Sequence, residues 1–157
     1  MPKTINLNGR CVGEGQSVFV IAEIGINHNG DLELAKNLID VAKESGCDAV
    51  KFQKRNPDQC VPPEMRKRMR ETPWGHISYL EYRRKTEFGI NEYQEIDKYC
   101  RKKEIQWFTS CWDEDSIDFI LPFNPPAFKV PSAMATNKEL LKRVRATGKP
   151  VILSTGM

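Results

Sequence analysis

The feature that most constrains the fold is a regular alternation of short apolar segments with amphipathic segments. Three apolar, β-branched stretches begin 22 and 24 residues apart, at 105–110, 127–130 and 151–155. Helical stripes lie between them, with Asp113 and Asn137 as predicted N-caps. Strands that alternate with helices at this spacing lie parallel in one sheet. The pattern therefore predicts an α/β fold.

An earlier strand–helix–strand unit is predicted over residues 18–53. A buried strand over 18–24 leads to a helix that Asp31 caps and Gly46 ends, and a second strand follows over 47–53. The crossover between these strands is expected to be right-handed. Residues 1–17 are polar and contain glycine, which predicts a short hairpin, and Asn91 is predicted to cap a further helix.

Residues 54–90 separate the second strand from the third. They include four prolines, a basic piece predicted to be helical near 64–70, and the aromatic residues Trp74, Tyr79, Tyr82 and Phe88. The segment is too long for a plain connection and too aromatic for a disordered linker. We interpret it as an insertion that lies over the carboxyl end of the sheet.

A TIM (β/α)8-type barrel is favoured over an open doubly wound sheet. Polar residues occur near the end of every predicted strand, and a barrel brings these ends to one mouth. The sequence contains neither a G-x-G-x-x-G motif nor a Walker-type phosphate-binding loop, so the usual reason to predict an open nucleotide-binding sheet is missing. The residues at the strand ends are Glu23, Lys51, Gln53, Thr109, Ser110, Lys129, Ser132, Ser154 and Thr155.

Charge and composition exclude several classes of protein. The net charge of +3 is too small to predict nucleic-acid binding. Basic residues do cluster at 66–70 and 83–85. We interpret these clusters either as a solvated helical surface or as a local attraction for an anionic ligand. The five cysteines form no C-x-x-C pair and indicate reduced thiols. No apolar run suits a membrane helix or a signal peptide. We expect a cytoplasmic protein that binds no membrane.

The strand ends predict a site for a small anion. Lys51 and Gln53 are two residues apart and project from one face of their strand, while Val50 and Phe52 project from the other. Lys51 and Lys129 can neutralise a phosphate or a carboxylate, and nearby hydroxyls can complete the cradle. Glu23 can act as a base. A Schiff-base lysine at Lys51 or Lys129 is the competing interpretation.

Four motifs closely resemble the N-terminal part of the sialic acid synthase family. They are the ten residues IAEIGINHNG at 21–30, VKFQ at 50–53, FKVPS at 128–132 and LSTGM at 153–157. The resemblance runs from about residue 10 to the last residue. It includes the N-acetylneuraminate synthases and their legionaminate, pseudaminate and spore-coat relatives.

The resemblance implies a TIM barrel that condenses phosphoenolpyruvate with an N-acetylated hexose, such as N-acetylmannosamine, and releases phosphate by carbon–oxygen cleavage. Phosphoenolpyruvate would be held by the residues that match Lys51, Gln53, Thr109 or Ser110, Lys129 and Ser132. Glu23 would face the sugar or the attacking water. A divalent metal, Mn or Mg, would polarise the sugar aldehyde. The full-length parent is expected to be a homodimer that binds these small substrates and no nucleic acid.

Three positions qualify the resemblance. Ala133 and Met134 follow Ser132 where the family often has glycine and an acidic residue, so the acid–base assignment and the acceptor sugar stay open. His28 is interpreted as a structural turn residue rather than a metal ligand. His76, in the insertion, is a candidate sugar contact.

The length of 157 residues predicts only part of a barrel, since a complete one typically needs about 250. We expect the first five strands of a truncated chain, with the metal ligands beyond Met157 and the family's C-terminal antifreeze-like domain absent. Such a segment is expected to be inactive by itself. Two alternatives are a non-enzymatic half-barrel that binds a small phosphorylated anion, and another aldolase-type barrel.

Overall fold

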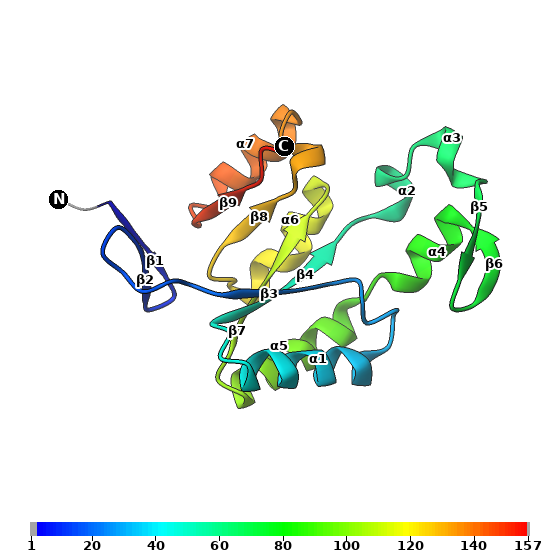
Figure 1. The fold of residues 1–157 in the computed structure, drawn as a ribbon. Coiled ribbons are helices and arrows are strands. Elements are labelled where there is room, and N and C mark those ends of the chain that lie inside the picture. The colour runs from blue at the N-terminus through cyan, green and yellow to red at the C-terminus, as the bar shows by residue number, and fades with distance from the viewer. Residues whose placement is uncertain (1–2, 157) are drawn as a thin grey trace.

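A parallel sheet of five strands forms the centre of the molecule. The computed structural model describes residues 3–156. The sheet has the order β3-β4-β7-β8-β9, so each new strand joins next to its predecessor (Figure 1). Sequential parallel order is the arrangement of a barrel, and the structure is a partial barrel. Its strands are β3 (Ile21–Gly25), β4 (Ala49–Lys54), β7 (Gln106–Cys111), β8 (Phe128–Val130) and β9 (Val151–Leu153).

The two outer strands are shorter than predicted. Strand β3 begins at Ile21 rather than at residue 18, and β9 ends at Leu153 rather than at residue 155. Val18 is 79% exposed although its β-branched neighbourhood resembles a buried strand. Strand pairing needs a partner backbone as well as an apolar sequence. Before Ile21, the N–H of Val20 bonds instead to the Asp48 carboxylate.

Four helices of seven or more residues follow the sheet strands and cover its outer face. They begin largely as the sequence predicts, because Asp31, Asp113 and Asn137 accept hydrogen bonds from the first turn of their helices. Asn91 was wrongly predicted as a cap. The helix there starts at Ile90, and the Glu92 carboxylate accepts the N–H of Gly89 instead. The helices are α1 (Leu32–Glu44), α5 (Ile90–Lys102), α6 (Glu114–Ile120) and α7 (Lys138–Ala146).

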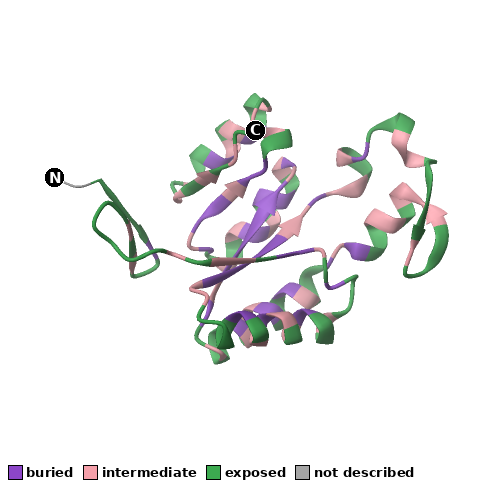
Figure 2. Ribbon diagram, in the orientation of Figure 1, coloured by how far each residue is buried: buried purple, intermediate pink, exposed green. Residues whose placement is uncertain are grey.

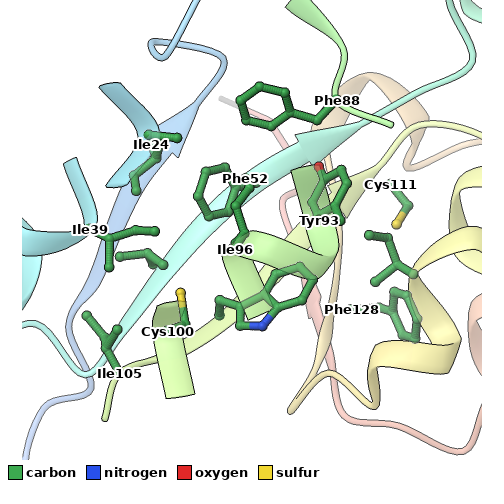
Figure 3. Close-up of a cluster of buried hydrophobic side chains, with 14 of the residues drawn as sticks. Ile24, Ile39, Phe52, Phe88, Tyr93, Ile96, Cys100, Ile105, Cys111 and Phe128 are labelled. Atoms are coloured by element: carbon green, nitrogen blue, oxygen red, sulfur yellow. The ribbon is translucent and has the colours of Figure 1, made fainter. Parts of the chain in front are cut away.

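The hydrophobic core lies between the sheet and these helices (Figure 2). Val50 and Phe52 of β4 are fully buried in this core. This agrees with the prediction that they project from the face of the strand opposite Lys51 and Gln53. In Figure 3, Phe52 and Tyr93 lie together at its centre, and their rings meet edge to face with centroids 6.4 Å apart. Because apolar residues fill this face, the polar residues that alternate with them are left on the other face of the sheet.

The insertion over residues 54–90 is structured and extends from the carboxyl end of β4 (Figure 1). The helix predicted near 64–70 is confirmed only at its start, because the helix ends at Arg66 and a hairpin strand begins at Met69. The turn of this hairpin is held by Thr72, whose hydroxyl donates to the Gly75 carbonyl at 2.7 Å. The elements are α2 (Pro57–Cys60), α3 (Pro63–Arg66), β5 (Met69–Thr72), β6 (Gly75–Ser78) and α4 (Tyr79–Thr86).

The predicted N-terminal hairpin is confirmed as β1 (Thr4–Leu7) and β2 (Arg10–Gly13), which pair antiparallel. The Gln106 side chain donates to the Leu7 carbonyl at 3.0 Å. Since Gln106 is the first residue of β7, the hairpin lies at the amino end of the sheet, opposite the insertion. Among residues 3–156, no helix has the length and apolarity needed to span a membrane.

Candidate active site

Polar side chains from four neighbouring strands meet on the face of the sheet that the helices leave uncovered. The register aligns Glu23 with Lys51, and it aligns Gln53, Ser110 and Lys129 across three strands. The Lys51 ammonium donates to the Ser110 hydroxyl at 2.8 Å and forms an ion pair with the Glu23 carboxylate. We call Glu23, Lys51, Gln53, Ser110 and Lys129 the inner cluster.

Gly25 makes room for two members of this cluster. The pairing of β3 with β4 is irregular between Glu23 and Gly25, and Gly25 has a φ of +57°. A Cβ at Gly25 would lie 3.1 Å from both the Glu23 carboxylate and the Gln53 amide nitrogen. The glycine thus permits a backbone angle that other residues rarely adopt, and it lets these two side chains approach each other.

The inner cluster has more positive than negative charge. Lys51 is 6% exposed, whereas the side chain of Glu23 is 52% exposed and lies open to solvent. Burial lowers the pKa of Lys129, the nearby Lys51 charge lowers it further, and Glu23 partly opposes both effects. Two ammonium groups therefore share one carboxylate, and an anionic ligand between them would relieve their repulsion.

Of the predicted pair Thr109 and Ser110, only Ser110 joins the inner cluster. Thr109 lies on the opposite face, is fully buried, and has its hydroxyl 3.2 Å from the Cys111 sulfur. The expectation that Thr109 reaches the mouth is wrong, because successive residues of a strand point to opposite faces. Ser132 is exposed in the turn that follows β8, at the same end of the sheet as Lys129.

Arg55 and Glu87 complete the site, and sequence reasoning missed both. The Arg55 guanidinium donates to the side-chain amide oxygen of Gln53, lies 3.1 Å from the Glu87 carboxylate and stacks 4.2 Å from the Trp112 ring centre. Glu87 also accepts the Arg55 backbone N–H at 3.2 Å. Both ends of the insertion are thereby joined beside Gln53. The sequence did contain a signal for both residues. Arg55 is a charged residue directly after a predicted strand, and Glu87 is a charged residue directly before the buried Phe88.

His28 has a structural role in the turn after β3. It is 2% exposed and stacks on Phe88 with ring centroids 4.0 Å apart. Its Nδ1 accepts the Gly30 N–H at 3.1 Å, and its own N–H donates to the Gly25 backbone. Both ring nitrogens are thus engaged within the turn. His76, the other histidine, is exposed on β6 opposite Glu71, and it is not part of the inner cluster.

We expect the buried His28 to make stability depend on pH. Burial lowers its pKa to about 4, although the bond to Gly25 and the Asp31 charge oppose this shift. In the unfolded chain the His28 imidazole has its ordinary pKa near 6.5, so at a pH between about 4 and 6.5 it binds a proton that it does not bind in the folded chain. The free energy of unfolding should therefore fall as pH drops from about 6.5 to 4, by roughly 3 kcal/mol at most. An NMR titration of the imidazole signals would test this, with a His28 midpoint near 6.5 contradicting it.

The described residues do not form a metal site. Within residues 3–156, no three His, Cys, Asp or Glu side chains come together in an arrangement that could hold a metal ion. Besides the Glu23 carboxylate, the inner cluster contains two ammonium groups, an amide and a hydroxyl. The ammonium groups would repel a bound cation. The residues present therefore suit an anion rather than a metal ion.

The chain is similar to known proteins over most of its length. The NeuB family model matches residues 38–157. The chain is 37% identical to N-acetylneuraminate-9-phosphate synthase of Homo sapiens, over 100% of this chain and 44% of that protein. It is 35% identical to N,N'-diacetyllegionaminic acid synthase of Campylobacter jejuni, over 90% of this chain and 43% of that protein.

A solved structure of similar fold is the N-acetylneuraminic acid synthetase of Leptospira borgpetersenii in complex with citrate. It superposes with a TM-score of 0.85 at 29% identity, covering 100% of this chain and 51% of that one. The chain thus spans less than half the length of the two relatives above and about half of this structure.

Proposed function

Because the chain belongs to the NeuB family, we propose that it supplies the phosphoenolpyruvate-binding part of a nonulosonic acid synthase. The observation that carries this proposal is the inner cluster, in which Lys51 and Lys129 share the single carboxylate of Glu23. Phosphoenolpyruvate carries a phosphate and a carboxylate close together, and two adjacent ammonium groups match this pair of anionic groups.

The proposed reaction joins phosphoenolpyruvate to an N-acetylated hexose. C3 of phosphoenolpyruvate attacks the aldehyde carbon of the open-chain sugar, which takes up a proton at its oxygen. Water adds at C2, and the bond between C2 and the bridging oxygen then breaks, so that phosphate leaves with that oxygen. The products are a nine-carbon 2-keto acid and inorganic phosphate.

Each side chain of the inner cluster has a role in this proposal. Lys51 and Lys129 hold the anionic groups, with Gln53 and Ser110 as further hydrogen-bonding partners and Ser132 at the rim. Glu23 accepts the proton of the attacking water, since its carboxylate is half exposed and lies beside Lys51.

The proposal extends to features of the whole enzyme. It needs a divalent metal, manganese or magnesium, with ligands from outside residues 3–156. A homodimeric whole protein and a cytoplasmic location remain predictions.

Phosphate release tests the proposal. The natural protein that carries this sequence is incubated with manganese, phosphoenolpyruvate labelled with oxygen-18 at the bridging position, and N-acetylmannosamine or a related N-acetylated hexose. We expect phosphate only when both substrates are present, and we expect the label in the phosphate. Release without label, or no release with any such acceptor, would argue against a nonulosonic acid synthase.

One observation favours an aldolase-type alternative. Burial and the neighbouring Lys51 lower the pKa of Lys129, which is the environment that activates a lysine for Schiff-base formation. Borohydride reduction in the presence of a keto acid distinguishes the two. A covalent adduct at Lys129 would support the aldolase, whereas the synthase predicts an unmodified lysine. Saturable binding of phosphoenolpyruvate with neither reaction would indicate the non-enzymatic half-barrel.

A further inference from the structure

The side-chain amide of Gln53 lies between the start of the insertion and the rest of the inner cluster. Its oxygen accepts a hydrogen bond from the Arg55 guanidinium. Its nitrogen lies 3.1 Å from the position that a Cβ at Gly25 would occupy, and the Glu23 carboxylate lies at the same distance from that position. The NH2 group of the amide therefore faces the inner cluster, and the amide oxygen faces Arg55.

The orientation of this amide determines whether Gln53 attracts or repels an anion. An amide NH2 group has two donors, whereas the amide oxygen only accepts. The two orientations, related by a flip of the amide, have nearly the same shape, so the hydrogen-bond partners distinguish them. With its NH2 group toward the inner cluster, Gln53 can donate to a phosphate or a carboxylate. With its oxygen there, it would repel the same group.

The inner cluster by itself does not select one orientation of the amide. The Glu23 carboxylate favours the NH2 group, but it is half exposed and pairs with Lys51. The ammonium groups of Lys51 and Lys129, on the same face of the sheet, favour the oxygen, because an ammonium group can only donate. A partner on the other side of the amide can therefore decide between the two orientations.

Arg55 is such a partner, and it is held in place on several sides. It is 4% exposed, its guanidinium stacks on Trp112, and its Nε lies 3.1 Å from the Glu87 carboxylate. Glu87 also accepts the backbone N–H of Arg55. A guanidinium has no acceptor atom, so Arg55 can bond to the oxygen of the Gln53 amide and not to its NH2 group. The planar group is already ordered, so little entropy is lost in forming this bond.

The backbone at the end of β4 is held by contacts that do not involve Arg55. The Gln53 backbone carbonyl accepts from the Tyr93 hydroxyl at 3.0 Å, and the Lys54 ammonium donates to the Phe88 carbonyl at 2.7 Å. Lys54 also lies 3.7 Å from the Glu87 carboxylate, so Glu87 keeps a counter-charge when Arg55 is replaced. The contact of Arg55 with the Gln53 amide can thus be removed while the strand stays in place.

We propose that Arg55 is a positioning residue for phosphoenolpyruvate binding, which holds the Gln53 amide with its NH2 group toward the inner cluster. The inference rests on the proposed function, because it assumes that the inner cluster binds phosphoenolpyruvate. Arg55 itself does not contact the substrate. It acts through Gln53, whose NH2 group then adds two donors to the two ammonium groups of the cluster.

A double-mutant cycle, measured by calorimetric titration of the natural protein with phosphoenolpyruvate, tests this role. We expect Arg55→Met to weaken binding roughly 3- to 10-fold, and Gln53→Met to weaken it at least as much, which is the range for one hydrogen bond. In the Gln53→Met background, Arg55→Met should weaken binding by less than about twofold, because no amide remains to be oriented. Arg84→Met is the matched control, since it removes another arginine of the insertion, one that pairs with Asp58.

Equal losses from Arg55→Met in the two backgrounds would overturn the proposal, because Arg55 would then act on the anion directly, through its charge or through the fold. Unchanged binding in Arg55→Met, or an equal loss in Arg84→Met, would also overturn it. If Arg55→Met does not fold, Arg55→Lys takes its place in the cycle. Lysine keeps a charge beside Glu87 without the planar guanidinium, so we expect a smaller loss that again disappears in the Gln53→Met background.

NMR of the protein without substrate separates failure of this inference from failure of the proposed function. We expect nuclear Overhauser cross-peaks between the Gln53 side-chain amide protons and the Gly25 Hα protons. They should weaken in Arg55→Met and persist in Arg84→Met. Equally strong cross-peaks in Arg55→Met would contradict the positioning role, whether or not phosphoenolpyruvate binds. The expected cross-peaks without any binding of phosphoenolpyruvate would contradict the proposed function and leave the orientation of the amide by Arg55 intact.

Discussion

Replacing Glu23 by glutamine is expected to lower turnover by about 10²- to 10⁴-fold, which is the usual contribution of a general base. Glutamine keeps the shape of the side chain and its place beside Gly25, but it cannot take a proton from water. The Michaelis constants should change much less, because the hydrogen-bonding oxygen beside Lys51 is retained. Steady-state phosphate release, with each substrate varied in turn, measures both effects.

Glu33→Gln is the control for this substitution. Glu33 lies on α1 in an exposed ion pair with Lys36, so its loss should leave turnover unchanged. If Glu23→Gln keeps turnover within about twofold of the wild type, Glu23 is not the general base of the reaction.

Replacing Lys51 by methionine should weaken phosphoenolpyruvate binding by about 1.5–3 kcal/mol, or roughly 10- to 150-fold. Methionine fills much of the same volume without the charge. The substitution removes the partner of both Ser110 and Glu23, and it leaves Lys129 as the single ammonium of the inner cluster. Direct titration with phosphoenolpyruvate is the appropriate measurement, since KM equals Kd only when chemistry is slow.

Lys98→Met provides a matched control for Lys51→Met. The Lys98 side chain is 81% exposed on α5, on the far side of the core from the inner cluster. An unchanged phosphoenolpyruvate affinity in Lys51→Met would remove Lys51 from the site. An equal loss in Lys98→Met would point to the net charge of the protein instead of a specific contact.

The sequence by itself determined the order of the sheet elements and most of the inner cluster. Alternation of apolar and polar residues within β4 is a local property, so it placed Lys51 and Gln53 on one face and Phe52 on the other without knowledge of the rest of the chain. The helix starts at Asp31, Asp113 and Asn137 were equally local, because a capping side chain bonds to N–H groups only two or three residues away.

Only the tertiary structure decided which neighbouring residue of a pair belongs to the site. Thr109 and Ser110 are both polar and both near a strand end, but the register of β7 against β4 aligns Ser110 with Gln53 and turns Thr109 into the core. The same holds for the start of β3, where the partner strand determines which residues are paired.

The contact between Arg55 and Glu87 shows the physical reason most clearly. The two residues are 32 positions apart, and the path of the insertion between them depends on a hairpin and three short helices that pack together. The local sequence pattern indicates which side of a helix or strand is apolar. It does not indicate where a long insertion returns to the sheet, because that position depends on how the whole insertion packs against the sheet.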